Sequence, residues 1–267
     1  MQRLIDEDEE RQIKERGRAA VQSAIVFELH PETLRLFGIA AFWAMSIFAV
    51  TMTKLFVSAD IANSPLVGMF GYNNICVYWD YSPSRELTAM FYPLVEVPLI
   101  AYIVLQCLQV VRDHRRDIVP TWFLRFVYVI TPIQLLLMLW FRMIFVVDAF
   151  VDVKGHTAGF LGLQVAMCLI ALQNLLYQKL HGYALPFPSW VWDAYMGLLV
   201  VVTATKMTHT LLLFFAEGGS FIDVTTAGGA KLAKMIDVAW MLLAAVVPIG
   251  LAELQRRSEP GLTFRIA

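Results

Sequence analysis

The chain has 267 residues, of which 58% are hydrophobic and only 16% are charged, whereas about a quarter of the residues in soluble domains carry a charge. This composition excludes a disordered chain, a fibrous protein and an ordinary water-soluble enzyme, and it is typical of an integral membrane protein. The formal net charge of −1 creates no global positive field, so nucleic acid is not an expected partner. The three cysteines, Cys76, Cys107 and Cys168, form no C-x-x-C pair, which argues against a disulfide framework or a zinc knuckle.

The N-terminal segment, residues 1–30, predicts a charged and then amphipathic helix on the inner side of a membrane. Residues 1–18 are dense in charge, and Glu7 and Arg11 have the i,i+4 order that supports a helix. Residues 19–29 then become apolar, as in a helix that lies along the membrane interface. The segment lacks the apolar core of a signal peptide.

Six stretches of the chain are long and apolar enough to cross a membrane. A hydrocarbon layer about 30 Å thick needs roughly 20 apolar residues in a helix, and backbone groups in lipid must be hydrogen-bonded within the segment. We expect spans near residues 36–58, 87–111, 122–148, 156–178, 190–215 and 236–254. The sequence therefore predicts an all-α polytopic membrane protein, with a six-helix transmembrane domain over residues 31–256 and a short polar tail over residues 257–267.

The basic residues of the loops predict which side of the membrane holds the termini. One side receives most of them, in the N-terminal part, the second loop, the end of the fourth span and the tail: Arg11, Lys14, Arg16, Arg18, Arg35, Arg112, Arg115, Arg116, Lys179, Arg256, Arg257 and Arg265. The other loops carry fewer: Arg85, Lys154, Lys231 and Lys234. Because basic loops stay inside, we expect an integral multi-pass protein with both termini on the inner side, in the mitochondrial inner membrane or an endomembrane.

Ionisable side chains inside the expected spans gather in the outer half of the bundle, where each is a candidate functional residue. They are Glu96, Arg142, Asp148, His156, Lys206, His209 and Asp237. Because charges in lipid must pair to be tolerated, we expect a network of ion pairs that clamps the helices. In this network Arg142 pairs with Glu96 or Asp148, and Lys206 pairs with Asp237. The alternative is a polar chamber open to the outer side, in which Lys206 and His209 relay protons or anions.

Small and polar residues of the fourth span predict how it packs. Gly155, Gly159 and Gly162 lie near its start, and the first two form a G-x-x-x-G motif that lets helices approach closely. His156 and Asn174 share one face of the same helix, which indicates a polar seam that points inward.

No motif in the sequence indicates catalysis or a cofactor. The chain lacks the G-x-S-x-G, P-loop, dinucleotide-binding and H-E-x-x-H patterns. A haem between His156 and His209, or a metal held by histidine with Glu96 and Asp237, would be needed by an intramembrane enzyme. We expect neither, and bound lipids are the only ligands that we expect.

Two short motifs resemble a known family. The chain approaches its second span with Ser-Pro-Ser-Arg, residues 82–85, and its fourth span opens with His-Thr-Ala-Gly-Phe, residues 156–160. This order resembles the six-span superfamily of damage-regulated autophagy modulators and related lipid-remodelling proteins. The resemblance implies a non-catalytic membrane protein that takes part in lipid handling in endomembranes.

Taken together, these features favour a non-catalytic accessory subunit of a larger membrane complex, with an energy-converting complex as one candidate. The expected partners are the lipid bilayer and other membrane-protein subunits. Two alternatives stay open: a small ion- or proton-coupled transporter or channel, which would use the polar chamber, and an endomembrane lipid-organising protein.

Overall fold

The structure is a computed structural model, and it describes residues 25–58, 61–181, 188–216, 219–258 and 261–266. The described chain forms two compact units. The larger unit contains all the helices that the structure describes, and the described part of the smaller unit contains two short strands.

Among the described residues, six helical segments of the larger unit are long and apolar enough to cross a membrane. They are Pro31–Phe56, Ser84–His114, Thr121–Val146, Val153–His181, Ser189–Phe215 and Ala227–Ser258. Each contains more than the roughly 20 residues that a bilayer core requires. The all-α class and the six apolar helices expected from the sequence are therefore confirmed.

Three of these segments are continuous helices and three are broken. The continuous ones are α2 (Pro31–Phe56), α8 (Val153–His181) and α9 (Ser189–Phe215). The broken ones are α4 (Ser84–Phe91) with α5 (Pro93–His114), α6 (Thr121–Trp140) with α7 (Met143–Val146), and α10 (Ala227–Met241) with the π-helical turn η3 (Leu242–Val246) and α11 (Val247–Ser258). Pro93 accounts for the first break, because proline fits the first turn of a helix and not its interior.

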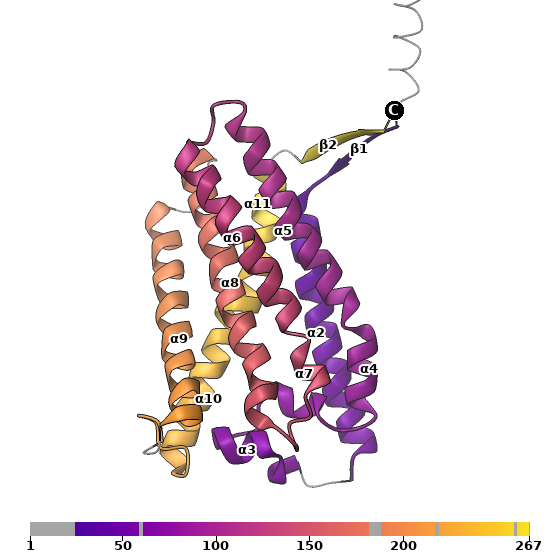
Figure 1. Ribbon diagram of the computed structural model, residues 1–267, viewed down its shortest axis with the longest axis vertical. Coiled ribbons are helices and arrows are strands. Elements are labelled where there is room, and N and C mark those ends of the chain that lie inside the picture. Colours follow the sequence, from indigo (N-terminus) through magenta and orange to yellow (C-terminus); the bar gives the residue numbers. More distant parts are fainter. Residues whose placement is uncertain (1–24, 59–60, 182–187, 217–218, 259–260, 267) are drawn as a thin grey trace, which may run out of the picture. The chain divides into compact units, whose positions relative to one another are not determined.

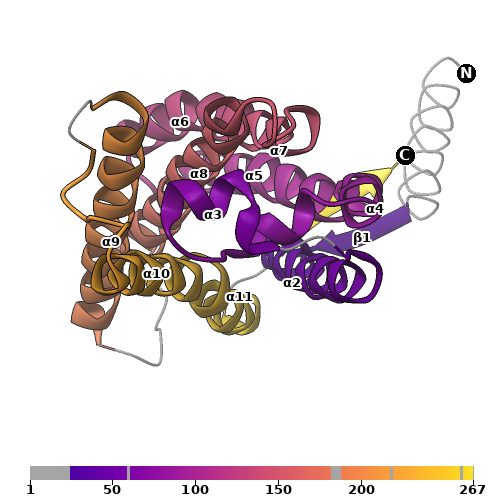
Figure 2. The same cartoon turned by 90° about the horizontal axis from the view of Figure 1, so that it is seen from below.

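The helices of the larger unit pack side by side as a bundle. In this bundle α2 packs against α5 and α11, α6 packs against α5 and α8, and α9 packs against α8 and α10. Figure 1 shows the long helices running along the bundle, and Figure 2 shows the same helices end-on. Large apolar side chains such as Ile47, Leu136, Val201 and Phe215 lie exposed on the sides of these helices. Soluble monomers rarely expose so much apolar surface, whereas lipid-facing helices require it.

The segment between α2 and α4 folds across one end of the bundle, which we call the α3 end (Figure 2). It contains a 3₁₀ turn, η1 (Ile61–Asn63), a short helix, α3 (Pro65–Phe70), and a second 3₁₀ turn, η2 (Ile75–Trp79). The side chains of Ser64 and Asn74 accept hydrogen bonds from the first backbone N–H groups of α3 and η2. Gly71 ends α3 with a φ of 74°, a conformation that favours glycine.

Trp79 anchors this segment in the core. It is 1% exposed, its ring stacks on Phe160 with 5.9 Å between centroids, and it meets Phe42 and Phe141 edge-on. Aromatic pairs of this kind contribute about 0.5–1.5 kcal/mol beyond their buried area. The segment is thus part of the bundle core and carries Asp80 into the interior.

The smaller unit is a two-stranded antiparallel sheet of β1 (Ile25–Leu29) and β2 (Leu262–Ile266). We expected β1 to continue the N-terminal helix and β2 to belong to a polar tail, and the structure differs at both places. Both segments are rich in the β-branched and aromatic residues that favour strands, and each finds its pairing partner at the other end of the chain. The rest of the expected N-terminal helix, residues 1–24, lies outside the described residues.

Candidate functional site

The structure distributes the predicted polar residues over several contacts between pairs of elements. The first joins α5 to the break between α6 and α7. Arg142 donates from Nε to Oε1 of Glu96 at 2.6 Å and from Nη2 to Oε2 at 2.5 Å. The carboxylate of Glu96 is 1% exposed, whereas the side chain of Arg142 is 57% exposed. The predicted pairing of Arg142 with Glu96 is confirmed, and its two parallel hydrogen bonds fix the geometry.

The second contact joins α9 to α10. Lys206 forms an ion pair with Asp237, and its ammonium group lies 4.6 Å from the centre of the Trp240 ring. The predicted pairing of Lys206 with Asp237 is confirmed. The aromatic face adds a cation–π attraction to the ion pair.

Asp148 has a different partner from the one that the sequence suggested. Arg85 of α4 donates from Nη1 to Oδ2 of Asp148 at 2.8 Å, and the backbone N–H of Phe150 donates to Oδ1. Both charged side chains are partly exposed, and ion pairs of this kind contribute little to stability. Because Arg142 bonds to Glu96, Asp148 pairs instead with Arg85 at the start of the second segment.

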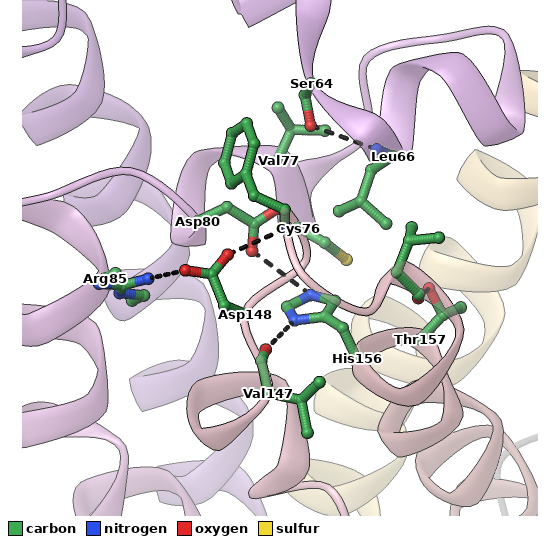
Figure 3. Close-up of polar contacts among 12 residues, drawn as sticks. Ser64, Leu66, Cys76, Val77, Asp80, Arg85, Val147, Asp148, His156 and Thr157 are labelled. Atoms are coloured by element: carbon green, nitrogen blue, oxygen red, sulfur yellow. Dashed lines mark hydrogen bonds and ion pairs between the residues drawn. The ribbon is translucent and has the colours of Figure 1, made fainter.

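His156 faces a carboxylate that sequence reasoning did not single out (Figure 3). Its Nδ1 lies 2.9 Å from the carbonyl oxygen of Val147, and its Nε2 lies 3.4 Å from Oδ1 of Asp80. His156 is 1% exposed and Asp80 is 6% exposed. Asp80 directly follows η2 in the loop between the first and second expected spans, and no sequence pattern around it indicates that it turns inward.

His209 and Lys206 bond to different partners in the structure. The Nδ1 of His209 lies 2.6 Å from Oγ of Ser220. Thr205 and Thr210 donate to the carbonyl oxygens one turn earlier, those of Val201 and Lys206. These intrahelical bonds satisfy the two hydroxyl groups within α9.

A narrow cavity lies under α3, between α8, α9 and α10. Its polar lining is formed by Tyr72, Asn74, Cys76, His156, Thr157, Gln164, Lys206, Thr210 and Asp237. It has room for about two water molecules. Three polar atoms of its buried lining have no hydrogen-bond partner within the described chain: Oε1 of Gln164, Nε2 of His156 and Nε1 of Trp240. The cavity therefore offers both acceptors and a donor to a small polar guest such as water or an ion.

Burial favours the uncharged forms of Asp80 and Cys76 beside this cavity. It is the main cause that raises the pKa of Asp80 to about 8; the nearby Asp148 carboxylate also raises this pKa, and Arg85 opposes the shift. Burial, followed by the Asp237 carboxylate, also raises the pKa of the Cys76 thiol. Because the thiolate is the reactive form of cysteine, Cys76 is not an activated nucleophile.

A second buried polar network lies at the opposite end of the bundle, which we call the Arg35 end. Its members are Glu32, Arg35, Tyr102, Asn174 and Gln255. Arg35 lies 2.6 Å from the carboxylate of Glu32, Asn174 donates to the hydroxyl of Tyr102 at 3.0 Å, and Gln255 bonds to both Arg35 and Asn174. The network joins α2, α5, α8 and α11. The sequence analysis placed Asn174 on the polar face of the fourth span and Arg35 among the basic residues of the inner side, but it did not indicate that the two belong to one network.

Two further cavities continue the line that begins under α3, and each adjoins the one before it. The middle one shares Trp240 and Met241 with the α3-end cavity, and it exposes no polar surface. The third cavity shares Leu99 and Ala244 with the middle one and reaches the network at the Arg35 end. Narrow cavities thus follow one another through the bundle, with polar groups at both ends and an apolar middle.

The glycines of the fourth span differ in their roles. A Cβ atom on Gly159 would lie 2.9 Å from Cγ2 of Ile144, and one on Gly162 would lie 3.1 Å from Cδ1 of Trp140. Both positions therefore let α8 approach the third segment closely. Gly155 instead donates its N–H to Asp152 at 2.9 Å, within the turn that begins α8.

In the part of the chain that the structure describes, no group of three or more His, Cys, Asp or Glu residues could hold a metal ion. His156 and His209 have the separate partners given above. No protein-family model, curated protein or solved structure gives a significant match to the chain. The resemblance to the autophagy-modulator superfamily therefore stays a prediction.

Proposed function

We propose that this chain is a multi-pass membrane protein that passes a small ion or proton through its bundle, as a small transporter or channel. The observation that carries the proposal is the line of adjoining cavities. Their two ends are polar, and atoms such as Oε1 of Gln164 lack a partner within the described chain, as expected where a small polar guest binds.

Two features support insertion in a membrane. The six helices are long and apolar enough to span one, and their sides expose large apolar residues.

The antiparallel pairing of β1 with β2 brings together segments that precede the first span and follow the last. An even number of crossings puts both segments on the same side, in agreement with the pattern of basic loops.

The apolar middle cavity corresponds to a closed gate. An ion loses its hydration there without gaining polar contacts, which is costly, and apolar constrictions close channels by dewetting. The sixth segment contributes Ala244 and Ala245 to this gate from η3. Since π-helical turns within helices often occur at functional sites, we propose that η3 allows the sixth segment to shift when the gate opens.

Flux through purified protein in liposomes tests this function. The wild type should carry protons or a monovalent cation, measured with a trapped pH dye and with ion-selective dyes. Lys206→Met should reduce the flux at least tenfold, because it removes the charged partner of Asp237 beside the α3-end cavity. Ala244→Leu should also reduce it, because Ala244 lines both the middle cavity and the one next to it.

Leu136→Phe provides the matched control, because it adds bulk to an exposed position on the side of α6. It should leave the flux unchanged. Thermal unfolding in detergent separates loss of flux from loss of the fold. Absence of flux from folded wild-type protein, or flux that Lys206→Met and Ala244→Leu leave intact, would contradict the proposal.

The accessory-subunit and lipid-organising functions stay predictions. Purification in a mild detergent followed by mass spectrometry addresses both of them. Stoichiometric membrane-protein partners would favour a subunit, and retained lipids would favour a role in lipid organisation.

A further inference from the structure

We infer that Asp80 and His156 form a proton-binding site that holds one shared proton between Oδ1 and Nε2. The inference deepens the proposed function, on which its coupling role rests, by naming the proton as the coupled ion. The binding of the proton itself depends only on the geometry of the two side chains.

The backbone fixes the tautomer of His156. Its Nδ1 lies 2.9 Å from the carbonyl oxygen of Val147, and a carbonyl oxygen only accepts hydrogen bonds. Nδ1 must therefore carry a hydrogen atom and donate it to Val147. In a neutral imidazole this leaves Nε2 with a lone pair and no hydrogen.

That lone pair points toward a carboxylate oxygen. Nε2 lies 3.4 Å from Oδ1 of Asp80, and both side chains are buried (Figure 3). Without a proton between them, two acceptors would face each other away from water, which is strongly unfavourable. One proton removes the conflict, whether it is bound to Asp80 as a carboxylic acid or to His156 as an imidazolium.

Burial of Asp80, and after it the nearby Asp148 carboxylate, favour the carboxylic acid form. Asp148, in the turn before α8, opposes the ionisation of Asp80. Arg85 of α4 favours the ionisation of Asp80, but its guanidinium group is bonded to Asp148. Cys76 of η2 is the third titratable neighbour, and it stays neutral. Lys206 and Asp237, which face Cys76 from α9 and α10, neutralise each other. The raised pKa of Asp80 agrees with this arrangement.

The pair has access to the proposed pathway. His156 lines the α3-end cavity, and its Nε2 lies among the unpartnered polar atoms there. A water molecule in the cavity can deliver a proton to Nε2 or remove one from it. Release of the proton leaves the Asp80 carboxylate facing an Nε2 atom that carries no hydrogen. The deprotonated pair is therefore the less stable form, which favours either a rearrangement or the binding of another proton.

Infrared spectroscopy of the purified protein in nanodiscs tests the site directly. The wild type should show the C=O stretch of a protonated carboxylic acid that disappears with a midpoint near the pKa of Asp80, about 8. Asp80→Asn should abolish this component, and His156→Gln should move its midpoint to lower pH, because an amide can donate to the ionised carboxylate. Asp223→Asn, at an exposed loop aspartate, should leave the component unchanged.

The inference fails if the wild type shows no such titration, or if Asp80→Asn leaves it intact. Should Asp80→Asn not fold, the midpoint in His156→Gln decides, and an unchanged midpoint overturns the shared proton. The flux assay is read separately. A titration at Asp80 in protein without flux leaves the proton site standing and refutes the proposed function, and flux without the titration refutes only the proton site.

Discussion

Arg142 holds the buried carboxylate of Glu96 through two parallel hydrogen bonds, although its own side chain is mostly exposed. The pair therefore joins a buried side chain to an exposed one. An arginine near the end of a membrane helix can extend its charged end toward the interface while its stem stays in the apolar layer. The stability of α5 at this point depends on the arginine.

Arg142→Met should lower the Tm in detergent by roughly several degrees, because it leaves the Glu96 carboxylate buried without its counter-charge. Adding Glu96→Leu should restore most of the loss, since the double variant contains no unpaired charge. Differential scanning fluorimetry of the wild type, the two single variants and the double variant measures this coupling. Additive effects of the two substitutions would show that the pair does not stabilise the fold.

Gly159→Ala should destabilise the bundle by about 1–3 kcal/mol, because the new Cβ would meet Cγ2 of Ile144 at 2.9 Å. Gly197→Ala is the matched control. A Cβ there meets nothing within 4 Å, and alanine favours a helix by roughly 0.5–1 kcal/mol over glycine. Thermal unfolding should therefore move in opposite directions for the two variants. Equal shifts would contradict the close approach of α8 to the third segment.

Gln255→Leu should cost about 1–3 kcal/mol, because it removes the amide that donates to Oδ1 of Asn174 in the network at the Arg35 end. Arg257→Gln, two positions along α11 and exposed, should have almost no effect. Chemical unfolding in mixed micelles gives both values. A neutral result for Gln255→Leu would show that the network does not hold α11 to α8.

The stability of the folded chain should fall as the pH rises from about 4 to about 8. Asp80 has a folded pKa of about 8, whereas the ordinary pKa of an aspartate is 3.8, so across this range the folded state retains a proton that the unfolded state has lost. Stability therefore decreases with pH in this window and levels off above it. Asp80→Asn should flatten this part of the curve of Tm against pH. A wild-type Tm that rises between pH 5 and 8, with Asp80→Asn making no difference, would contradict the raised pKa.

The sequence predicted the local features of the bundle well. Apolar runs identified all six helices, because the length and hydropathy of a span are properties of one continuous segment. The pairings of Arg142 with Glu96 and of Lys206 with Asp237 were also predicted, since a charge in an apolar helix requires an opposite charge nearby. The strands β1 and β2 were not predicted, because the pairing that defines a sheet lies between segments at opposite ends of the chain.

What the sequence alone determined is which parts of the chain form long apolar helices and which charged side chains need partners. Only the tertiary structure decided that Asp80 turns inward to His156, that Gln255 meets Asn174, and that cavities adjoin through the bundle. The physical reason is that these features depend on the packing of residues far apart in the chain. Burial of Trp79 draws Asp80 into the core, and no pattern of neighbouring residues records that contact.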